Sequence, residues 1–329
     1  MGIDIGGETH TIMDIRQIHT PVMLERTLEI LDPALAHPDA VFIDATLGMG
    51  GHTEAVLERH PHVRVLGLDR DTQALDIARE RLAAFGTRVE FVHTVYDAIA
   101  QSWSLTGWPR PTAILFDLGV SSLQLDRAER GFAYSQDAPL DMRMDAEDER
   151  TAAEILNSYD ESELRAIFQT YGEEKLAARY ARAIVQARRE SPLTRSAVLV
   201  DVLNDATPMA LRSAGHPAKR VFQALRIEVN RELAVLTDAI PHALDILALH
   251  GRMVVLAYQS LEDRIVKQAF AEATAVNAPA DLPVVPESLL PQFHLITRGA
   301  EMADDVERAR NARSIPVRLR AIERVKEAA

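Results

Sequence analysis

Short apolar runs alternate with helical patterns over the first 120 residues. Four runs rich in Val, Ile, Leu and Phe have the continuity of strands that are buried on both faces. Between them apolar residues recur at helical spacing, most clearly over 72–86, where Gly86 marks the helix end. The predicted strands are 40–48, 63–71, 88–96 and 112–120. This alternation predicts an α/β fold with a parallel sheet that helices cover on both faces.

The alternation stops after the fourth strand. The next strand pattern, 251–260, begins about 130 residues later, whereas a crossover between parallel strands takes roughly 10–30 residues. Only helical patterns lie between, and the last, 218–249 with a break near Pro241, fits the missing crossover helix. Two more strands are expected at 293–299 and 314–323.

These lengths predict three parts. Residues 1–18 form a loose leader, 126–216 an inserted helical domain for substrate recognition, and 19–125 with 217–329 the sheet domain. The sheet domain opens with a helix from His19 that Asp32-Pro33 is expected to stop.

Composition excludes several classes of protein. The 329 residues include no cysteine, which excludes disulfide scaffolds, thiolate metal sites and cysteine nucleophiles. The histidines form no convincing ligand cluster, so no metal is expected. No apolar run reaches the roughly 18 residues of a membrane span, and the acidic N-terminal segment does not resemble a signal peptide. We therefore expect a cytoplasmic protein.

The net charge of −13 argues at first against nucleic acid, because phosphates bind Lys and Arg. The charge is unevenly distributed, however. The windows 179–195, 212–231 and 308–326 carry +4, +4 and +6, which leaves −27 for the rest. Basic stripes on an acidic body fit two interpretations, solvated helix faces or a surface that binds nucleic acid.

Acidic residues and glycines gather where the predicted strands end. Asp44, Gly48, Gly50 and Gly51 follow the first strand, and Asp69 ends the second. Glycines let the backbone pass close to a ligand, and an acid at the second strand can accept hydrogen bonds from ribose hydroxyls. Asp117 ends the fourth strand and points to the same crevice. The pattern predicts a cofactor that contains a nucleoside.

Two cofactor classes fit this pattern. A dinucleotide site has the spacing G-x-G-x-x-G, and its third glycine is missing here. An S-adenosylmethionine (SAM) site has an acid before the glycines that meets the ammonium group of the cofactor, and Asp44 is suitably placed. The spacing favours SAM, with an NAD-dependent oxidoreductase as the alternative from another class.

Ordered blocks across nearly the whole chain resemble the 16S rRNA (cytosine(1402)-N(4))-methyltransferase family, called RsmH or MraW. The blocks are His19 to Leu24, Asp44 to His52, Asp69 to Asp71, Asp117 to Ser122 with Gln124 to Asp126, Arg130 to Phe132, Leu140 to Asp145, Tyr171 to Glu174, Phe222 to Ile227 with Val229-Asn230, and Ser260 to Arg264 with Val266-Lys267. The resemblance implies a Rossmann-like SAM-dependent methyltransferase sheet with a helical domain inserted after the fourth strand.

The resemblance also implies roles for individual residues. Gly50, Gly51 and His52 match the cofactor loop, Asp69 the ribose acid, and Tyr96 the aromatic residue beside the adenine. The remaining cofactor contacts fall on Asp117 and Gln124. The implied substrate is 16S rRNA, within small-subunit particles, and a homodimer stays open.

One departure from the family bears on the mechanism. The family usually has Ser-Phe-His-Ser where this chain has Ala257-Tyr258-Gln259-Ser260, and Gln cannot take up a proton at neutral pH. The cytosine amine becomes positive only at transfer and loses its proton afterwards, so positioning and electrostatics should dominate. We expect Asp117, or the carbonyls after it, to accept from the amine, and Tyr258 or Phe132 to stack on the base.

The basic windows are expected to bind rRNA phosphates. The candidate residues are Arg188, Arg189, Lys219, Arg220, Arg313 and Arg318. Three other readings stay open: a methyltransferase of another RNA or a small molecule, the NAD-dependent oxidoreductase, and a SAM-binding protein without catalysis.

Overall fold

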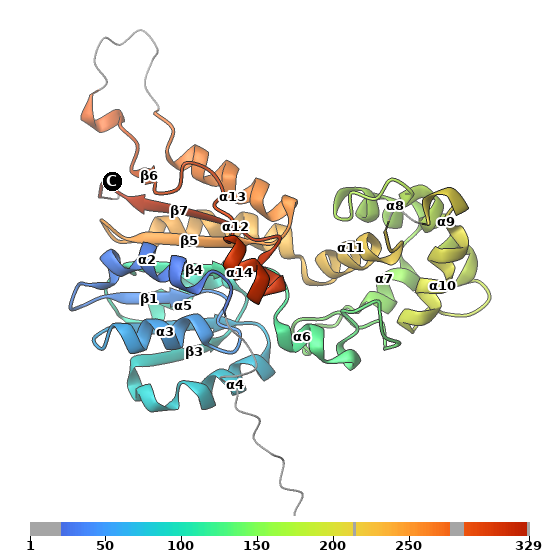
Figure 1. The fold of residues 1–329 in the computed structure, drawn as a ribbon, viewed down its shortest axis with the longest axis horizontal. Coiled ribbons are helices and arrows are strands. Elements are labelled where there is room, and N and C mark those ends of the chain that lie inside the picture. The colour runs from blue at the N-terminus through green and yellow to red at the C-terminus, as the bar shows by residue number, and fades with distance from the viewer. Residues whose placement is uncertain (1–20, 213–214, 277–285, 328–329) are drawn as a thin grey trace, which may run out of the picture.

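The computed structural model describes residues 21–212, 215–276 and 286–327. The expected leader 1–18, with His19 and Thr20 of the first family block, lies outside the described residues. The described chain forms a lobe around a sheet and a lobe of helices (Figure 1). We call residues 21–126 and 231–327 the sheet lobe, and residues 127–230 the helical lobe.

The sheet has seven strands in the order β3-β2-β1-β4-β5-β7-β6. The pairs from β3 to β5 are parallel, and β7 is antiparallel to both of its neighbours, β5 and β6. The strands are β1 (Val41–Asp44), β2 (Arg64–Asp69), β3 (Val89–His93), β4 (Ala113–Asp117), β5 (Arg252–Ala257), β6 (Phe293–Leu295) and β7 (Arg318–Arg324). The seven predicted strands are thus confirmed. Because the strand order reverses between β1 and β4, a crevice opens at their carboxyl ends.

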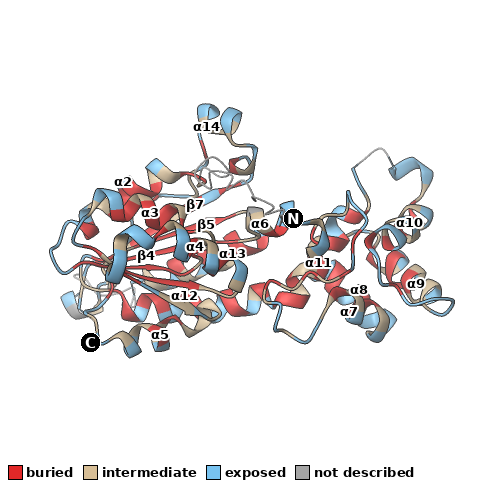
Figure 2. Ribbon diagram, turned by 90° about the horizontal axis from the view of Figure 1, so that it is seen from below, coloured by how far each residue is buried: buried red, intermediate tan, exposed pale blue. Residues whose placement is uncertain are grey.

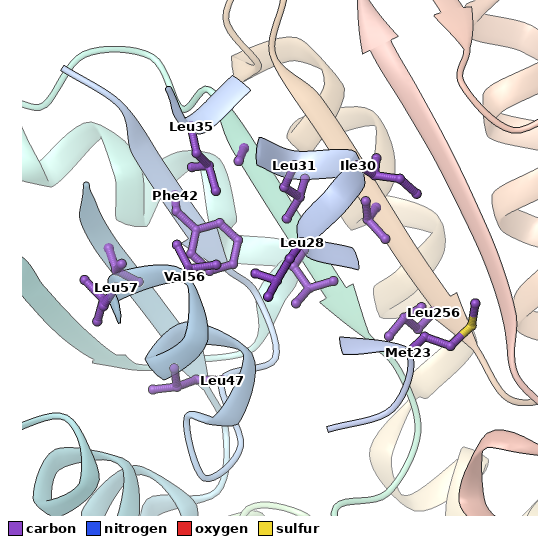
Figure 3. Close-up of a cluster of buried hydrophobic side chains, with 14 of the residues drawn as sticks. Met23, Leu28, Ile30, Leu31, Leu35, Phe42, Leu47, Val56, Leu57 and Leu256 are labelled. Carbon is purple, nitrogen blue, oxygen red and sulfur yellow. The ribbon is translucent and has the colours of Figure 1, made fainter. Parts of the chain in front are cut away.

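Helices cover both faces of the sheet. One face packs against α2 (Leu24–Leu35), α3 (Gly51–Arg59) and α4 (Thr72–Arg81), in the cluster that Figure 3 shows. The other packs against α5 (Ile99–Thr106), α12 (Glu232–Ile246) and α13 (Ser260–Ala273). Alternate strand residues enter the two cores, with Phe42 in the first and Ile43 in the second. This double burial is why the strands appear as unbroken apolar runs.

The expected end of the first helix at Asp32-Pro33 is wrong. Pro33 lies inside α2, which continues to Leu35. Leu31 and Leu35 are both fully buried in the core, and their packing outweighs the backbone hydrogen bond that proline cannot donate.

The helical lobe has its own apolar core (Figure 2). Its helices are α7 (Ala152–Ser158), α8 (Glu161–Thr170), α9 (Ala177–Ala187), α10 (Ser196–Ala206) and α11 (Ala218–Asn230). The buried face of α11, which includes Phe222 and Leu225, belongs to this core. The chain therefore returns to the sheet lobe at Arg231, and not at residue 217 as expected.

The helical segment predicted over 218–249, with a break near Pro241, does form two helices, but the break lies elsewhere. The break falls at Arg231, whose φ of 52° is left-handed, while Pro241 lies inside α12. The buried Asn230 explains the position of the break: its Nδ2 donates to the Met142 carbonyl over 2.8 Å and its Oδ1 accepts from the Met144 amide over 2.7 Å. These bonds anchor the end of α11 to the start of the helical lobe.

Shorter elements complete the described chain. They are α6 (Ser122–Asp126) and α14 (Asp305–Arg310), with 3-10 turns at Ala83–Arg88, Tyr96–Ala98, Ala128–Arg130, Met209–Leu211, Glu287–Leu289 and Ala312–Ser314. None of the helices in the described ranges has both the length and the apolar character of a membrane span.

Candidate active site

A cavity of about 390 Å³ lies at the carboxyl ends of β1, β2 and β4, with walls from both lobes. Met144, Gln223 and Arg226 of the helical lobe face it. Of the residues singled out in the sequence, those that line it are Gly48, Gly51, His52, Asp69, Tyr96, Asp117, Gln124, Tyr258, Gln259 and Arg313. The candidate cofactor and catalytic residues therefore largely meet at one place.

The glycine loop after β1 is a tight turn into α3. Gly48 and Gly50 have φ of 52° and 78°, values that favour glycine. A Cβ on Gly51 would lie 2.6 Å from Cγ of Pro21, so only glycine lets α3 begin under the cavity wall. Gly50 does not line the cavity and supports the loop from behind, next to Leu82.

The carboxylate of Asp69 is fixed by two backbone amides. Its Oδ2 accepts from Gly48 N over 2.7 Å and its Oδ1 from Asp71 N over 2.8 Å. Each oxygen keeps a further lone pair that can accept from a ligand hydroxyl. Burial raises the pKa of Asp69 to about 6 despite these bonds. The residue is held as a rigid acceptor for a diol.

Asp44 is buried behind the cavity and does not line it. Its Oδ2 accepts from the Thr53 hydroxyl over 2.8 Å and its Oδ1 from Thr46 N over 3.3 Å. Burial raises its pKa to about 6, with His52 acting in the opposite direction. The geometry gives Asp44 a role in holding the loop, and its contact with a cofactor ammonium group stays a prediction.

Asp117 is the acid that faces the cavity from β4. Its Oδ1 accepts from the Tyr258 hydroxyl over 2.7 Å, and its Oδ2 lies 3.7 Å from Nδ1 of His52. The Asp117 amide donates to the Thr46 hydroxyl over 2.6 Å. Burial raises the pKa of Asp117 to about 6, while the Tyr258 hydrogen bond lowers it. At neutral pH this carboxyl is ionised and can still accept a proton.

Tyr96 and Gln124 lie on the cavity wall in different ways. Tyr96 lies in the 3-10 turn that follows β3, and its ring stands edge-on to Phe116 at 5.6 Å between centroids and gives the cavity an apolar wall. Gln124 uses its Oε1 to accept from Ser121 N over 3.1 Å and its Nε2 to donate to Asp71 over 3.0 Å. Gln124 therefore holds the start of α6 and the end of β2 in position.

Phe132 is not brought to the cavity. Its side chain is buried in the core of the helical lobe, where Arg130 lies over its ring at 5.9 Å. Among the candidate stacking residues, only Tyr258 lines the cavity.

The candidate RNA-binding residues differ in their surroundings. Arg189 and Lys219 are exposed on the helical lobe, as is Arg220, which donates to the Glu173 carbonyl over 2.5 Å. Arg188 donates to the Leu156 carbonyl over 2.6 Å. Arg318 pairs with Asp263 at 3.1 Å, and Arg313 reaches the cavity while lying 3.4 Å from Asp126.

Sequence reasoning missed a buried charge cluster on the far wall of the cavity. Arg226 of α11 pairs with Glu232 of α12 at 2.8 Å, across the Arg231 break. Glu262 of α13 accepts from the amides of Tyr258 and Gln259 over 2.9 and 3.1 Å. Arg226 and Glu262 lie inside family blocks, but the burial of these side chains depends on tertiary packing that no local pattern predicts.

A second missed group joins the lobes beside Asp69. Arg70 donates to the Asn230 carbonyl over 2.9 Å and to Asp148 over 3.2 Å. Asp71 pairs with Arg130 at 3.1 Å. The end of β2, which positions Asp69, thus also binds both ends of the helical lobe.

The cavity suits a nucleoside that carries positive charge. Asp69 offers acceptors for a diol, Tyr96 an apolar wall, and Asp117 a negative charge. The arginines that line it are engaged with carboxylates or carbonyls, for example Arg81 with Glu54 at 2.7 Å, which disfavours a pyrophosphate. In the ranges that the structure describes, no group of three or more His, Asp or Glu side chains is placed to hold a metal ion.

Comparisons with known proteins found a matching family model, similar proteins and similar structures. The model of the MraW methylase family matches residues 16–325. Ribosomal RNA small subunit methyltransferase H of Leifsonia xyli is 59% identical over 309 residues, 94% of this chain and 95% of that protein. The protein of that name from Streptomyces avermitilis is 54% identical, over 94% and 98%. A putative methyltransferase from Streptococcus mutans, solved in complex with SAH, has a TM-score of 0.43 at 14% identity, over 93% and 99%.

Proposed function

The chain belongs to the MraW methylase family and is a SAM-dependent methyltransferase, and we propose that it methylates the exocyclic N4 of a cytidine in 16S rRNA, in the region of position 1402. When bound, SAM supplies an electrophilic methyl group on a sulfonium sulfur. Asp69, the Gly48 loop and Tyr96 would hold its ribose and adenine. The observation that carries the proposal is the carboxylate of Asp117, which faces the same cavity as Asp69.

In this proposal Asp117 is the residue that positions the target amine and accepts its proton. The exocyclic amine of cytosine is conjugated with its ring and is a poor nucleophile. A carboxylate that accepts from its N–H groups holds the amine in line with the methyl group. As the amine nitrogen takes the methyl group it becomes positive, and the fixed negative charge of Asp117 stabilises it. The nitrogen then releases one proton to Asp117 and is neutral again.

Tyr258 supports Asp117 from the end of β5. Its hydroxyl fixes one carboxylate oxygen, and a Cβ built on Gly119 would lie 3.7 Å from its ring. That distance is an ordinary contact, so glycine is favoured at 119 by its φ of 92° and not by lack of space beside the ring. We propose that Tyr258 orients Asp117 and that the Tyr258 ring also stacks on the target base. The base must move out of its stack in the RNA to enter the cavity.

The helical lobe supplies the basic surface for the RNA in this proposal. Arg189, Lys219 and Arg220 are exposed on it, and Arg313 stands at the cavity. The relatives carry ribosomal RNA and small subunit in their names. We propose small-subunit particles in the cytoplasm as the substrate, because a lobe of this size exceeds what a small metabolite needs.

The test is to incubate the purified chain with labelled SAM and unmethylated small-subunit particles, and to map the modified nucleotide by mass spectrometry. We expect one methyl group on N4 of a cytidine near position 1402. Methylation of a different atom would overturn the assigned site, and an unmethylated rRNA together with a methylated metabolite would favour the small-molecule alternative. Calorimetry with S-adenosyl-L-homocysteine (SAH), the product of methyl transfer from SAM, and with NAD tests the oxidoreductase hypothesis directly. Tight binding of NAD would support that hypothesis.

A further inference from the structure

His52 has only one ring nitrogen that can take up a proton. Its Nε2 lies 3.2 Å from the Val22 carbonyl, and a carbonyl oxygen can only accept a hydrogen bond. Nε2 must therefore carry the hydrogen, and the lone pair of the neutral ring is on Nδ1. Burial lowers the pKa of His52, so the ring is neutral at pH 7.

The free lone pair faces Asp117. Nδ1 of His52 lies 3.7 Å from Oδ2 of Asp117, while Oδ1 is occupied by the Tyr258 hydroxyl. The Asp117 backbone is fixed as well, because its amide donates a hydrogen bond to the Thr46 hydroxyl. The carboxylate therefore presents one oxygen to both the cavity and the histidine.

Carboxylates around His52 partly offset the burial that disfavours a positive ring. Among residues 21–212, 215–276 and 286–327, the charged and titratable groups near His52 are Asp44 from β1, Asp117 from β4, Glu307 from α14 and, behind Asp117, Tyr258 after β5. Asp44 and Glu307 raise the affinity of the ring for a proton and so oppose the effect of burial, which lowers the pKa of His52. No cation is among these groups.

We propose that His52 takes over the proton that Asp117 receives from the methylated amine, an inference that rests on the proposed function. The amine N–H bond breaks and an O–H bond forms on Asp117. That bond then breaks as Nδ1 of His52 gains the proton. Asp117 is again a carboxylate, and His52 is an imidazolium that later loses the proton to solvent.

The geometry suits this second transfer. The imidazolium keeps its Nε2–H bond to Val22 and donates its new Nδ1–H to Asp117, so the ring need not turn or change its other bond. A separation of 3.7 Å is longer than a hydrogen bond, and such contacts shorten when a substrate fills the site. Gln259, which replaces the histidine usual in the family, has no part in the transfer.

Chemical rescue separates a proton acceptor from a packing residue. We expect His52→Ala to keep the first, single-turnover methyl transfer and to slow steady-state turnover by about a hundredfold, the lower end of general acid–base effects, because Asp117 then stays protonated after the first transfer. Added imidazole should restore the rate, and more so as pH rises. Pyrazole, a ring of the same size that is a far weaker base, should not. Equal rescue by both rings, or no loss of rate, would overturn the proposal.

His60→Ala is the matched control, because His60 pairs with Asp32 at 2.9 Å outside the cavity. It should keep the wild-type rate with and without imidazole. If His52→Ala does not fold, His52→Gln serves instead: its amide can donate to Val22 but takes up no proton, so the same loss is expected. A rate for His52→Gln equal to wild type would overturn the proposal.

A measurement on the protein alone is independent of the substrate. Nitrogen-15 NMR of labelled histidine should show the His52 ring protonated on Nε2 at pH 7. A ring protonated on Nδ1 has no lone pair toward Asp117, and that result would overturn the inference even if the rRNA is methylated. Failure of the wild type to methylate rRNA would instead reject the proposed function.

Discussion

The Tyr258 hydroxyl donates to Oδ1 of Asp117 over 2.7 Å and joins the end of β5 to the end of β4. The bond favours the ionised form of Asp117 and so opposes burial, which raises its pKa to about 6. The two strands are adjacent and parallel, so the contact follows from sheet register. It lowers the pH above which Asp117 is ionised and can accept a proton.

Tyr258→Phe should therefore shift the pH dependence of transfer. Removal of the hydroxyl raises the pKa of Asp117 above 6, and the acid limb of the rate profile moves to higher pH. The rate should fall most near pH 6 to 7 and recover at pH 9, where Asp117 is ionised in both proteins. Tyr159→Phe, which removes a bond to Glu228 in the helical lobe, is the control and should leave the profile unchanged. An unshifted limb for Tyr258→Phe would contradict the role of this bond.

Asp117→Asn should be inactive yet more stable than wild type at neutral pH. The folded pKa of about 6 exceeds the ordinary value of 3.8, so the buried charge lowers the free energy of unfolding above pH 6. Below pH 3.8 the carboxyl is neutral in both states and this cost vanishes. We expect a gain of about 1–3 kcal/mol at pH 8 that disappears near pH 4. Denaturant unfolding at pH 4, 6 and 8 measures it, and equal stability at pH 8 would refute it.

Asp69→Asn should weaken SAH binding. An amide can accept from only one of the two backbone donors at Gly48 and Asp71, and its NH₂ group opposes the other. Loss of hydrogen bonds to a charged group costs about 1.5–3 kcal/mol, or about tenfold to a hundredfold in Kd. Calorimetry gives the affinity. Asp76→Asn on the exposed face of α4, which pairs with Arg79, should bind as wild type does. Equal affinities for the two variants would rule out the ligand role of Asp69.

The parts of this fold that the sequence predicts are those with a local signal. Each strand is a continuous apolar run, and the acids that end β2 and β4 stand next to such runs. Parallel strands then bring Asp69 and Asp117 to one edge without further information. The left-handed glycines at Gly48 and Gly50 follow from the same turn.

Residues whose environment depends on distant packing are harder to predict. The pattern of α11 shows an apolar face but not whether that face meets the sheet or the other helices. Phe132 is aromatic and close in sequence to the site residues, yet its side chain is buried in the core of the helical lobe. The bond between His52 and Val22 joins α3 to a segment that precedes α2. Neither the residue types nor their spacing in the sequence predicts that contact.

Gly131→Ala should destabilise the helical lobe strongly. A Cβ there would lie 2.2 Å from the Pro139 carbonyl oxygen, and φ is 73°. Gly107 has a similar φ of 66° with nothing near its Cβ position, so Gly107→Ala isolates the backbone term, about 1–2 kcal/mol. The Gly131 variant should lose more, because a backbone carbonyl must also move. Denaturant unfolding compares them, and equal losses would show that the Pro139 contact yields without cost.

Charge reversal on the helical lobe should weaken RNA binding in a salt-dependent way. Lys219 and Arg189 are exposed there, whereas Arg318 already pairs with Asp263. Each lost phosphate contact reduces the slope of log K against log salt by about 1. We expect Lys219→Glu and Arg189→Glu to show this reduction together with weaker binding at low salt. Arg59→Glu, in the sheet lobe beside Asp32, is the control and should keep the wild-type slope. An unchanged slope in both helical-lobe variants would place the RNA on another surface.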